Sequence, residues 1–386
     1  MDAEVIVVGG GPAGSHLARR LAEAGREVVL LDRARFPRDK VCGGGVSVKA
    51  AHLVGGLPPA LLRATVSGAL ISHRNRWLVE VMLGRPAGFM VTRRELDHWL
   101  LERARWAGAV VHQGVAYQDH RVTGRGVEVA CDAGRWRARL LVGADGAASR
   151  VRRRLVGQAQ RLNQPALEVL LPGGGRSALA GRALFDLGAV PGGYGWIFPK
   201  GDHLNVGVFS GVGPGVRRSH LRAFLRRYRL EEAGGRRLGY PIPLDGARGP
   251  WEGPGVWLVG DAAGLAEPML GEGIYHALLS AEIAAELIIS GETAPGRYSQ
   301  AVRRRLVPEL RAARRLARCL FPCAAPVVRY LARRPRFSRR FTALMTGELG
   351  FRRCWRETWL GLPLSCLAAP SLPLRGPLWF ESQPTG

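Results

Sequence analysis

Residues 4–14 read EVIVVGGGPAG, a short apolar run followed at once by a glycine-rich turn. Residues 13–24 then have the periodicity of a helix that ends before Gly25, and residues 27–31 form a second apolar run. Apolar runs of this kind are typical of parallel strands that are buried on both faces. The pattern therefore predicts a strand–helix–strand unit at the start of the chain.

The turn contains the pattern G-x-G-x-x-G, carried by Gly9, Gly11 and Gly14. The first glycine permits a tight turn, the second lets the backbone approach a pyrophosphate, and the third allows close packing of helix and strand. The anion is then held at the helix N-terminus, where free N–H groups and the helix dipole favour negative charge. Asp32 ends the second strand, 18 residues after Gly14, where a carboxylate can accept hydrogen bonds from ribose hydroxyls. Because the motif follows a strand and opens a helix, we expect a dinucleotide-binding site.

Two later segments resemble the FAD-binding oxidoreductases of the aromatic-hydroxylase type. Residues 141–150 read LVGADGAASR and residues 256–264 read VWLVGDAAG, each an apolar strand that ends in Asp-Gly or Gly-Asp. A helix is predicted over residues 273–290, just after the second segment. In that group the Gly-Asp aspartate binds the ribityl chain, and the following helix N-terminus stabilises negative charge at the pyrimidine end of the flavin. The resemblance gives these roles to Asp261 and to Gly271, Gly273 and Ile274.

Two further segments resemble the geranylgeranyl reductase family. Residues 37–47, PRDKVCGGGVS, are similar to its Lys-x-Cys-Gly-Gly-Gly loop, and residues 191–200, PGGYGWIFPK, match its P-x-x-Y-x-W-x-F-P motif at every fixed position. Residues 267–275, EPMLGEGIY, are similar to its flavin-side helix start. The resemblance runs from residue 1 to about residue 290. It implies an FAD-dependent enzyme that reduces isolated double bonds in prenyl chains, such as those of chlorophyll precursors, archaeal lipids or menaquinone.

The motif and the resemblance together predict the residues of the cofactor site. The predicted FAD-binding residues are Gly9, Gly11, Ala13, Gly14, Asp32, Arg33, Cys42, Gly43, Gly45, Arg93, Asp261, Gly271, Gly273 and Ile274. Arg94 adjoins Arg93, so this assignment could shift by one residue. Cys42 is the candidate catalytic residue, which would either donate a proton or order water and substrate.

The predicted substrate site is aromatic. A prenyl chain offers no polar group, so recognition depends on shape and apolar area. Tyr194, Trp196 and Phe198 alternate along a strand-like segment and would project to one face. With Pro199 they are expected to line a groove beside the flavin; the alternative is a stripe of core residues.

The predicted fold class is an α/β FAD-binding domain, Rossmann-like and of the glutathione-reductase type, with an antiparallel-sheet substrate domain and a helical C-terminal region. The FAD-binding domain takes residues 1–60, 93–154 and 250–295. Its expected elements include a helix at 94–107 and strands at 110–117, 126–131, 136–142 and 255–260. The substrate domain takes residues 61–92 and 155–249, with a strand-like pattern over 155–240. The Arg-rich helical region takes residues 296–386.

The formal net charge of +25 is carried almost entirely by arginine, since the chain has three lysines. Residues 297–356 hold 17 Arg against Glu309 and Glu348. A face this basic attracts anions such as lipid headgroups or acidic proteins, although GC-rich codons would also explain the arginine content. Apolar, proline-interrupted residues 360–374 suit docking at a membrane surface. We expect a cytoplasmic protein, at the inner face of the membrane, that does not bind nucleic acid because no nucleic-acid motif accompanies the charge.

No second G-x-G-x-x-G opens a helix, so the external reductant is expected to be transiently bound NAD(P)H or an acidic carrier such as ferredoxin. The cysteines and histidines have no metal-site spacing, and no metal is expected. Two other functions stay open. An FAD-dependent monooxygenase or halogenase would use the same scaffold, although residues 194–199, YGWIFP, depart from the halogenase motif W-x-W-x-I-P. A non-enzymatic prenyl-binding escort protein is opposed by the intact glycines, Asp32 and Asp261.

Overall fold

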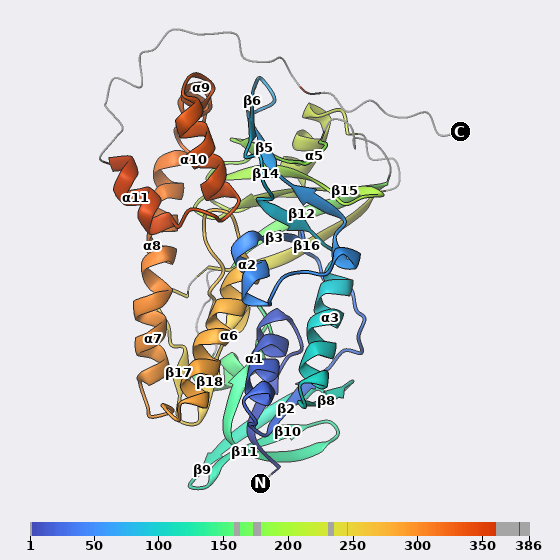
Figure 1. Cartoon of the computed structure of the whole chain (residues 1–386), viewed down its shortest axis with the longest axis vertical. Coiled ribbons are helices and arrows are strands. Elements are labelled where there is room, and N and C mark those ends of the chain that lie inside the picture. Colours follow the sequence, from blue (N-terminus) through green and yellow to red (C-terminus); the bar gives the residue numbers. More distant parts are fainter. Residues whose placement is uncertain are drawn as a thin grey trace.

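The computed structural model describes residues 2–157, 163–172, 179–230, 235–244, 246–359 and 378. Two large sheets lie toward opposite ends of an elongated molecule, with helices α1 (Pro12–Glu23), α3 (Arg93–Trp106) and α6 (Gly273–Ile289) between them (Figure 1). A third sheet has three strands, in the order β3 (Gly45–Ser47), β7 (Gly88–Met90) and β4 (Ala64–Val66).

The first large sheet has eight strands and a parallel centre. In spatial order its main path is β17 (Glu252–Gly253), β18 (Val256–Leu258), β11 (Gly134–Gly143), β1 (Ala3–Val8), β2 (Val28–Asp32) and β8 (Val110–Gln113). A hairpin of β9 (Tyr117–Thr123) and β10 (Gly126–Cys131) pairs with β11. The strands β18, β11, β1, β2 and β8 run parallel, so their carboxyl ends share one edge of the sheet. Gly9, Asp32 and Asp261 follow or end three of these strands and therefore meet at that edge.

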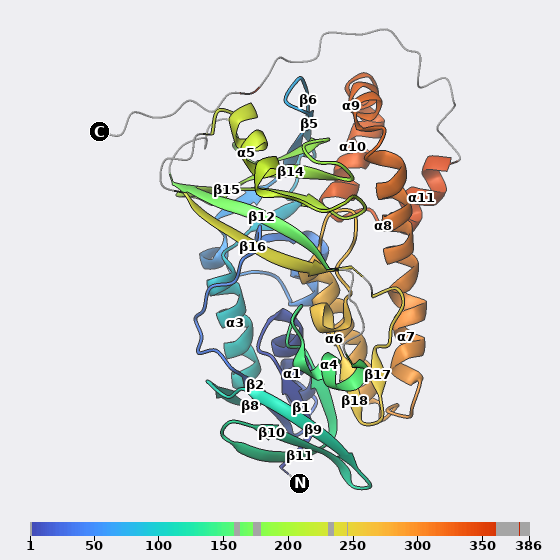
Figure 2. The ribbon, with the colours of Figure 1, turned by 180° about the vertical axis from the view of Figure 1, so that it is seen from behind.

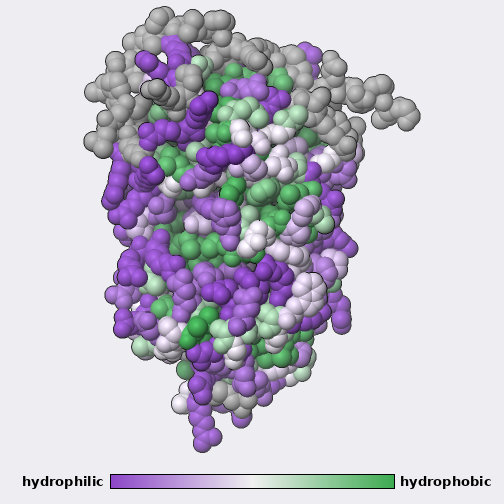
Figure 3. Space-filling view, in the orientation of Figure 1, coloured by the Kyte–Doolittle hydropathy of each residue, from purple (hydrophilic) through white to green (hydrophobic). Residues whose placement is uncertain are grey.

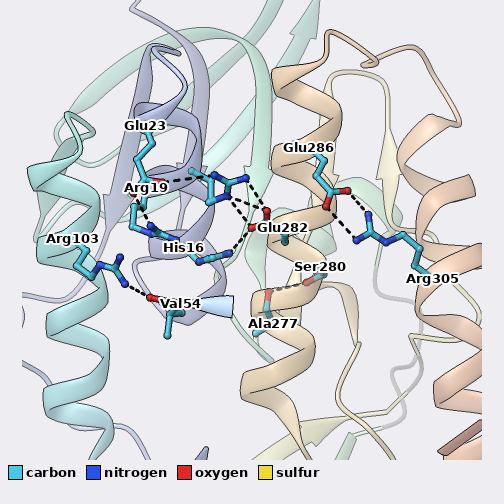
Figure 4. Close-up of polar contacts among 11 residues, drawn as sticks. His16, Arg19, Glu23, Val54, Arg103, Ala277, Ser280, Glu282, Glu286 and Arg305 are labelled. Carbon is cyan, nitrogen blue, oxygen red and sulfur yellow. Dashed lines mark hydrogen bonds and ion pairs between the residues drawn. The ribbon is translucent and has the colours of Figure 1, made fainter. Parts of the chain in front are cut away.

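Helix α1 starts directly at the glycine turn, with Pro12 in its first turn, and it packs against α6 and α3. Pro12 has no N–H, which costs nothing at this position because the first N–H groups of a helix have no partner within it. Figure 4 shows a polar contact between these two helices, in which His16 of α1 faces Glu282 of α6. The helix that opens the cofactor motif is thus held in place by α6.

The second large sheet has seven strands. In spatial order they are β16 (Arg236–Pro243), β12 (Asn163–Pro172), β15 (His203–Ser210), β14 (Gly193–Pro199), β13 (Arg182–Leu187), β5 (Gly68–His73) and β6 (Trp77–Met82). All neighbours are antiparallel except β13 and β5. One face packs on α5 (Arg218–Arg227), where Phe224 and Leu221 contact a cluster that includes Ile197. Because side chains alternate along a strand, the other face is left for the cavity described below.

The C-terminal helices run along one side of both large sheets (Figures 1 and 2). They are α7 (Arg297–Arg305), α8 (Val307–Leu320), α9 (Ala324–Arg333), α10 (Pro335–Met345) and α11 (Phe351–Trp359). Val302 of α7 belongs to the core of the first sheet, whereas Leu316 of α8 and Val328 of α9 belong to the core of the second. Within the part of the chain that the structure describes, no helix is long and apolar enough to span a membrane. The apolar segment 360–374 lies outside the described residues.

The predicted helices at 13–24, 94–107 and 273–290 are confirmed with their ends shifted by one residue or so. The single strand predicted over 110–117 is wrong. β8 ends at Gln113, and Gly114, at φ +77°, turns the chain before β9 begins at Tyr117. The strand predicted over 255–260 is shorter, Val256–Leu258, because Gly260 already starts the short helix η2 (Gly260–Ala263).

The remaining elements are short and connect the larger ones. They are α2 (Val48–Leu53), η1 (Pro59–Leu61) and α4 (Arg150–Val156). The three-stranded sheet crosses the domain boundary expected at residue 60, because β3 precedes that boundary whereas β4 and β7 follow it. The division into domains therefore remains a proposal.

Candidate active site

One cavity lies between the first and second large sheets. Its walls include the N-terminus of α1, residues 40–47, the inner face of the seven-stranded sheet and the N-terminus of α6. Residues 87–90 and Arg93 also line it. Met345 and Thr346, at the end of α10, add a contribution from the C-terminal helices. Segments far apart in the sequence thus contribute to a single site.

The start of α1 fits a pyrophosphate. An added Cβ at Gly9 would overlap the carbonyl oxygen of Ala144, and one at Gly14 would overlap that of Gly9, so both positions need glycine for packing. Gly11 differs, because the nearest atom to an added Cβ is Arg38 Nη2 at 3.9 Å, and Gly11 lines the cavity. No side chain caps this helix and no acidic residue lies in its first turn. The N-terminus therefore presents a bare, electropositive backbone to the cavity.

Asp32 ends β2 beside this turn and is buried. Its Oδ2 accepts a hydrogen bond from the Gly10 N–H at 2.6 Å, and its Oδ1 accepts one from the Ala34 N–H at 2.7 Å. The carboxylate is thus fixed next to the glycine turn, and Asp32 itself lines neither this cavity nor the second cleft. Arg33 is exposed and lines neither this cavity nor the second cleft described below.

Arg93 is the member of the Arg93–Arg94 pair that faces the cavity. It is buried, and its Nε and Nη2 donate to the two carboxylate oxygens of Asp97 at 2.7 Å each. Burial lowers the pKa of this guanidinium, but the Asp97 charge and hydrogen bonds, with a further hydrogen bond to Cys42, raise it overall. Arg94 is exposed and lies 3.7 Å from Asp39. Of the two arginines, only Arg93 lines the main cavity.

The loop of residues 40–47 carries Cys42, Gly43 and Gly45 along the cavity wall. Gly44 has φ +60°, and an added Cβ there would overlap the Val91 carbonyl oxygen, so this turn requires glycine. The Cys42 N–H donates to Glu168 Oε1 at 3.2 Å, which ties the loop to the second sheet. The loop thus lines the cavity together with the N-terminus of α1 and the aromatic residues of β14.

At the start of α6, Gly271, Gly273 and Ile274 line the cavity together with Asp261. Asp261 Oδ2 lies 3.7 Å from Lys40 Nζ. The N-terminus of α6, like that of α1, has no side-chain cap.

The residues around this helix start are held by ion pairs and hydrogen bonds. Glu272 accepts from the Ser47 hydroxyl at 2.6 Å and lies 2.9 Å from Lys49 Nζ. Burial raises the pKa of the nearby Glu267 to about 8, although the N–H groups of Leu270 and Met269 favour its carboxylate. These contacts fix the helix start relative to the loop of residues 40–47.

The aromatic strand β14 forms the opposite wall. The Tyr194 and Trp196 rings, and the Trp196 and Phe198 rings, have centroids 6.1 Å apart, and all three side chains line the cavity. The Tyr194 hydroxyl donates to the Leu270 carbonyl oxygen at 2.6 Å and Trp196 Nε1 donates to Asn205 Oδ1 at 2.6 Å, so the polar atoms are satisfied and the ring faces remain apolar. Pro199 lies at the end of the strand and lines neither cavity. Further aromatic side chains of the same wall are Phe185 and Phe209.

Two site residues escaped the sequence interpretation. Arg38 lies in the quoted loop motif, and its Nη1 lies 3.1 Å from Asp97 Oδ2 near Gly11. Glu168 lines the cavity from β12. Its signal was visible in the sequence, since it is the one charged residue of the strand NQPALEVLLP and alternates with the apolar residues Ala166 and Leu170.

Comparisons with known proteins place the chain among FAD-binding proteins and prenyl reductases. Residues 2–166 match the family model described as "FAD binding domain". The chain is 33% identical to digeranylgeranylglycerophospholipid reductase 1 of Methanopyrus kandleri, over 75% of this chain and 81% of that protein. It is also 33% identical to geranylgeranyl diphosphate reductase of Rhodobacter capsulatus (74% and 75%) and 34% identical to menaquinone reductase of Mycolicibacterium smegmatis (75% and 77%).

Solved structures share the fold. A geranylgeranyl bacteriochlorophyll reductase-like protein from Thermoplasma acidophilum superposes with a TM-score of 0.71 at 24% identity, over 82% of this chain and 87% of that one. A halogenase in complex with FAD superposes with a TM-score of 0.65 at 16% identity, over 83% and 76%. At these identities the likeness shows a common fold alone.

The matched domain and the fold define an FAD-dependent oxidoreductase. Within that class, identity of 33% to a digeranylgeranylglycerophospholipid reductase and a geranylgeranyl diphosphate reductase, over most of both chains, shows that the protein belongs to the geranylgeranyl reductase family.

Proposed function

We propose that the protein saturates isolated double bonds in the prenyl chain of a lipid or isoprenoid, with FAD as its redox cofactor. The observation that carries the proposal is the composition of one cavity, in which two bare helix N-termini face a wall of aromatic side chains. In its reduced form the bound FAD supplies a hydride to one carbon of the double bond.

The cofactor is proposed to lie along the shared edge of the first sheet. The open backbone at Gly11 and the N-terminus of α1 hold the pyrophosphate, and Asp32 accepts hydrogen bonds from the adenosine ribose. Asp261 binds the ribityl chain. The N-terminus of α6 stabilises negative charge on the pyrimidine side of the flavin. The remaining proposed contacts, in the loop and on α3, are Gly43, Gly45 and Arg93.

The prenyl chain is proposed to lie against Tyr194, Trp196 and Phe198. Burial of apolar area is the main source of binding energy for such a chain, at about 25 cal/mol per Å². The hydroxyl of Tyr194 and the indole N–H of Trp196 are already bonded to protein atoms, so neither needs a partner on the substrate. Cys42, on the loop between the two halves, either donates a proton or orders the substrate.

Three finer points are part of the proposal. The substrate is of the kind named for the relatives: a geranylgeranyl diphosphate, a digeranylgeranylglycerophospholipid or a menaquinone. The external reductant is NAD(P)H or an acidic carrier such as ferredoxin. The protein works at the inner surface of the membrane, held through its Arg-rich helices.

The test is oxidation of the reduced holoenzyme by substrate in the absence of oxygen. The purified protein is reduced with dithionite, freed of excess dithionite, mixed with geranylgeranyl diphosphate, and followed by flavin absorbance. We expect the oxidised spectrum to return at a rate that depends on substrate concentration. A Trp196→Ala variant should bind FAD but require more substrate, because it lacks much of the apolar wall. A reduced flavin that persists until air is admitted would contradict the proposal.

A further inference from the structure

Glu168 places a carboxyl group on a cavity wall whose other described residues are uncharged. Directly paired residues on neighbouring strands share a face, and Glu168 of β12 pairs with Gly207, which pairs in turn with Trp196 of β14. Among the described residues of the second sheet that line the cavity, the others carry no charge: Ala166, Ala183, Phe185, Tyr194, Trp196, Phe198, Phe209, Tyr240 and Ile242. Glu168 is only 4% exposed. A carboxyl group is costly at such a position, so its presence calls for a role.

The contacts of Glu168 hold it at the centre of the site. Its Oε1 accepts from the Cys42 N–H at 3.2 Å, and its side chain is hydrogen-bonded to Asn205. Because Asn205 Oδ1 already accepts from Trp196 Nε1, its amide N–H group is the donor to Glu168. Lys200 is also buried, donates to the Val91 carbonyl oxygen at 2.8 Å, and acts electrostatically on Glu168. The carboxyl group is thus fixed between the loop, the aromatic strand and a buried cation.

Glu168 also lies in the wall between two spaces. A second cleft opens on the other side of the loop, lined among others by Lys200, His203 and Asn205. Cys42, Arg93 and Glu168 line both this cleft and the main cavity. Burial raises the pKa of Glu168, against the opposing effects of the Asn205 hydrogen bond and the Lys200 charge. A raised pKa favours the protonated carboxyl, which is the form that a proton donor requires.

We propose that Glu168 is the general acid of the reduction, giving its proton to the double bond in the main cavity and recovering it from water in the second cleft. This role rests on the proposed function. The O–H bond of the Glu168 carboxyl breaks and leaves its electron pair on oxygen, while the π electrons of the double bond form a C–H bond to the proton. The other carbon receives the hydride of the reduced cofactor, so the alkene is reduced and the flavin is oxidised. The carboxylate left behind is stabilised by Asn205, Lys200 and the Cys42 N–H.

The decisive variant is Glu168→Gln, which keeps the shape and the acceptor for the Cys42 N–H but cannot deliver a proton. Holoenzyme is prepared first, and its FAD content and reduction by dithionite are expected to match the wild type. Anaerobic oxidation of the reduced holoenzyme by geranylgeranyl diphosphate should then slow about 100-fold or more, the usual contribution of a general acid. Oxidation by dissolved oxygen should be unchanged, because it protonates no carbon.

Two further variants make the result specific. Glu128→Gln, on β10 of the first sheet and away from both cavities, should keep the wild-type rate. Glu168→Asp keeps an ionisable carboxyl and should recover at least about a tenth of that rate, so it separates proton delivery from structural support. If the Gln variant fails to bind FAD, the rate of the Asp variant still tests whether Glu168 delivers the proton.

The outcomes separate this role from the function on which it rests. If wild type is oxidised by the prenyl substrate and Glu168→Gln keeps that rate, or if the Asp variant loses as much as the Gln variant, Glu168 is not the acid. If the wild type itself is not oxidised by any prenyl substrate, the proposed function fails and the role fails with it.

Discussion

The three glycines of the G-x-G-x-x-G turn are required for different reasons. Gly9 and Gly14 are fixed by packing against the Ala144 carbonyl oxygen and against each other, so their replacement would disturb the fold. Gly11 has space before it and borders the cavity, so the absence of a side chain there serves a ligand. The same motif therefore holds structural and binding positions that substitution can separate.

A Gly11→Ala variant should fold normally and lose FAD affinity, because its methyl group would occupy the space that the pyrophosphate needs. We expect the dissociation constant for FAD to rise at least about tenfold, which corresponds to about 1.4 kcal/mol. Titration of apoprotein with FAD measures this, and the melting temperature of the apoprotein should stay within about 2 °C of wild type. Gly124→Ala is the matched control, since nothing lies within 4 Å of an added Cβ there. Unchanged FAD affinity in Gly11→Ala would contradict the proposed pyrophosphate site.

Residues that the sequence singled out by motif line one cavity in the structure, as Gly11, Cys42, Asp261 and Trp196 do. Glu168 was missed because its role depends on which strands are neighbours. Its position between β15 and β16 brings it to Cys42, 126 residues earlier in the chain. Strand alternation places a residue on a face, but it does not say which face borders a cavity.

Side-chain hydrogen bonds and ion pairs connect helices α1 and α6 (Figure 4). His16 Nε2 lies 2.8 Å from Glu282 Oε2, and Arg20 Nε donates to Glu282 Oε1 at 3.0 Å. These bonds lower the pKa of Glu282 to about 2, with the His16 hydrogen bond as the largest contribution. Burial lowers the pKa of His16, so its ring is neutral near pH 7. The two helices whose N-termini face the cavity thus share a stabilising contact.

Replacing Glu282 by Gln should destabilise the protein by about 2 kcal/mol at neutral pH, the usual contribution of hydrogen bonds to a charged group. The pKa of Glu282 is lower in the folded than in the unfolded chain, about 2 against 4.5, so this stabilisation is complete above about pH 4.5 and is lost as the pH falls toward 2. Urea unfolding of wild type and variant at several pH values measures the difference.

The control for this prediction lies one helical turn away. Glu286→Gln removes an ion pair in which the side chains of Glu286 and Arg305 are 45% and 34% exposed. This variant should lose less than about 1 kcal/mol of unfolding free energy. A difference between wild type and Glu282→Gln that stays constant down to pH 2 would contradict the assignment.

Periodicity and helix-stop signals placed the long elements well, because α1, α3 and α6 each have a clear apolar face or a marked end. They failed at 110–117, where the break at Gly114 depends on a backbone turn between two short strands. The pairing of β3 with β7, which joins residues 45–47 to 88–90, has no local signal because strand pairing is a long-range interaction.

The charge of the molecule as a whole is concentrated along the C-terminal helices. Hydrophilic side chains cover much of the edge where α7 and α8 lie (Figure 3). Arg303, Arg304 and Arg311 are exposed on these helices. With a net charge of +25, this side is expected to bind anionic lipid surfaces.

The holoenzyme should sediment with vesicles that contain phosphatidylglycerol and remain in solution with vesicles of phosphatidylcholine alone. Salt at about 1 M shortens the screening length to about 3 Å and should release the protein. Equal binding to both kinds of vesicle, or binding that salt leaves unchanged, would contradict an electrostatic attachment.

The reaction proposed for the whole molecule is the reduction of an alkene by bound, reduced FAD. Its most direct test is the mass of the product formed in a single anaerobic turnover of reduced holoenzyme with geranylgeranyl diphosphate. We expect a product that has gained two hydrogen atoms for each reduced FAD that is oxidised, and no oxygen. An unchanged substrate beside a flavin that stays reduced, or a product that gains oxygen once air is admitted, would contradict it.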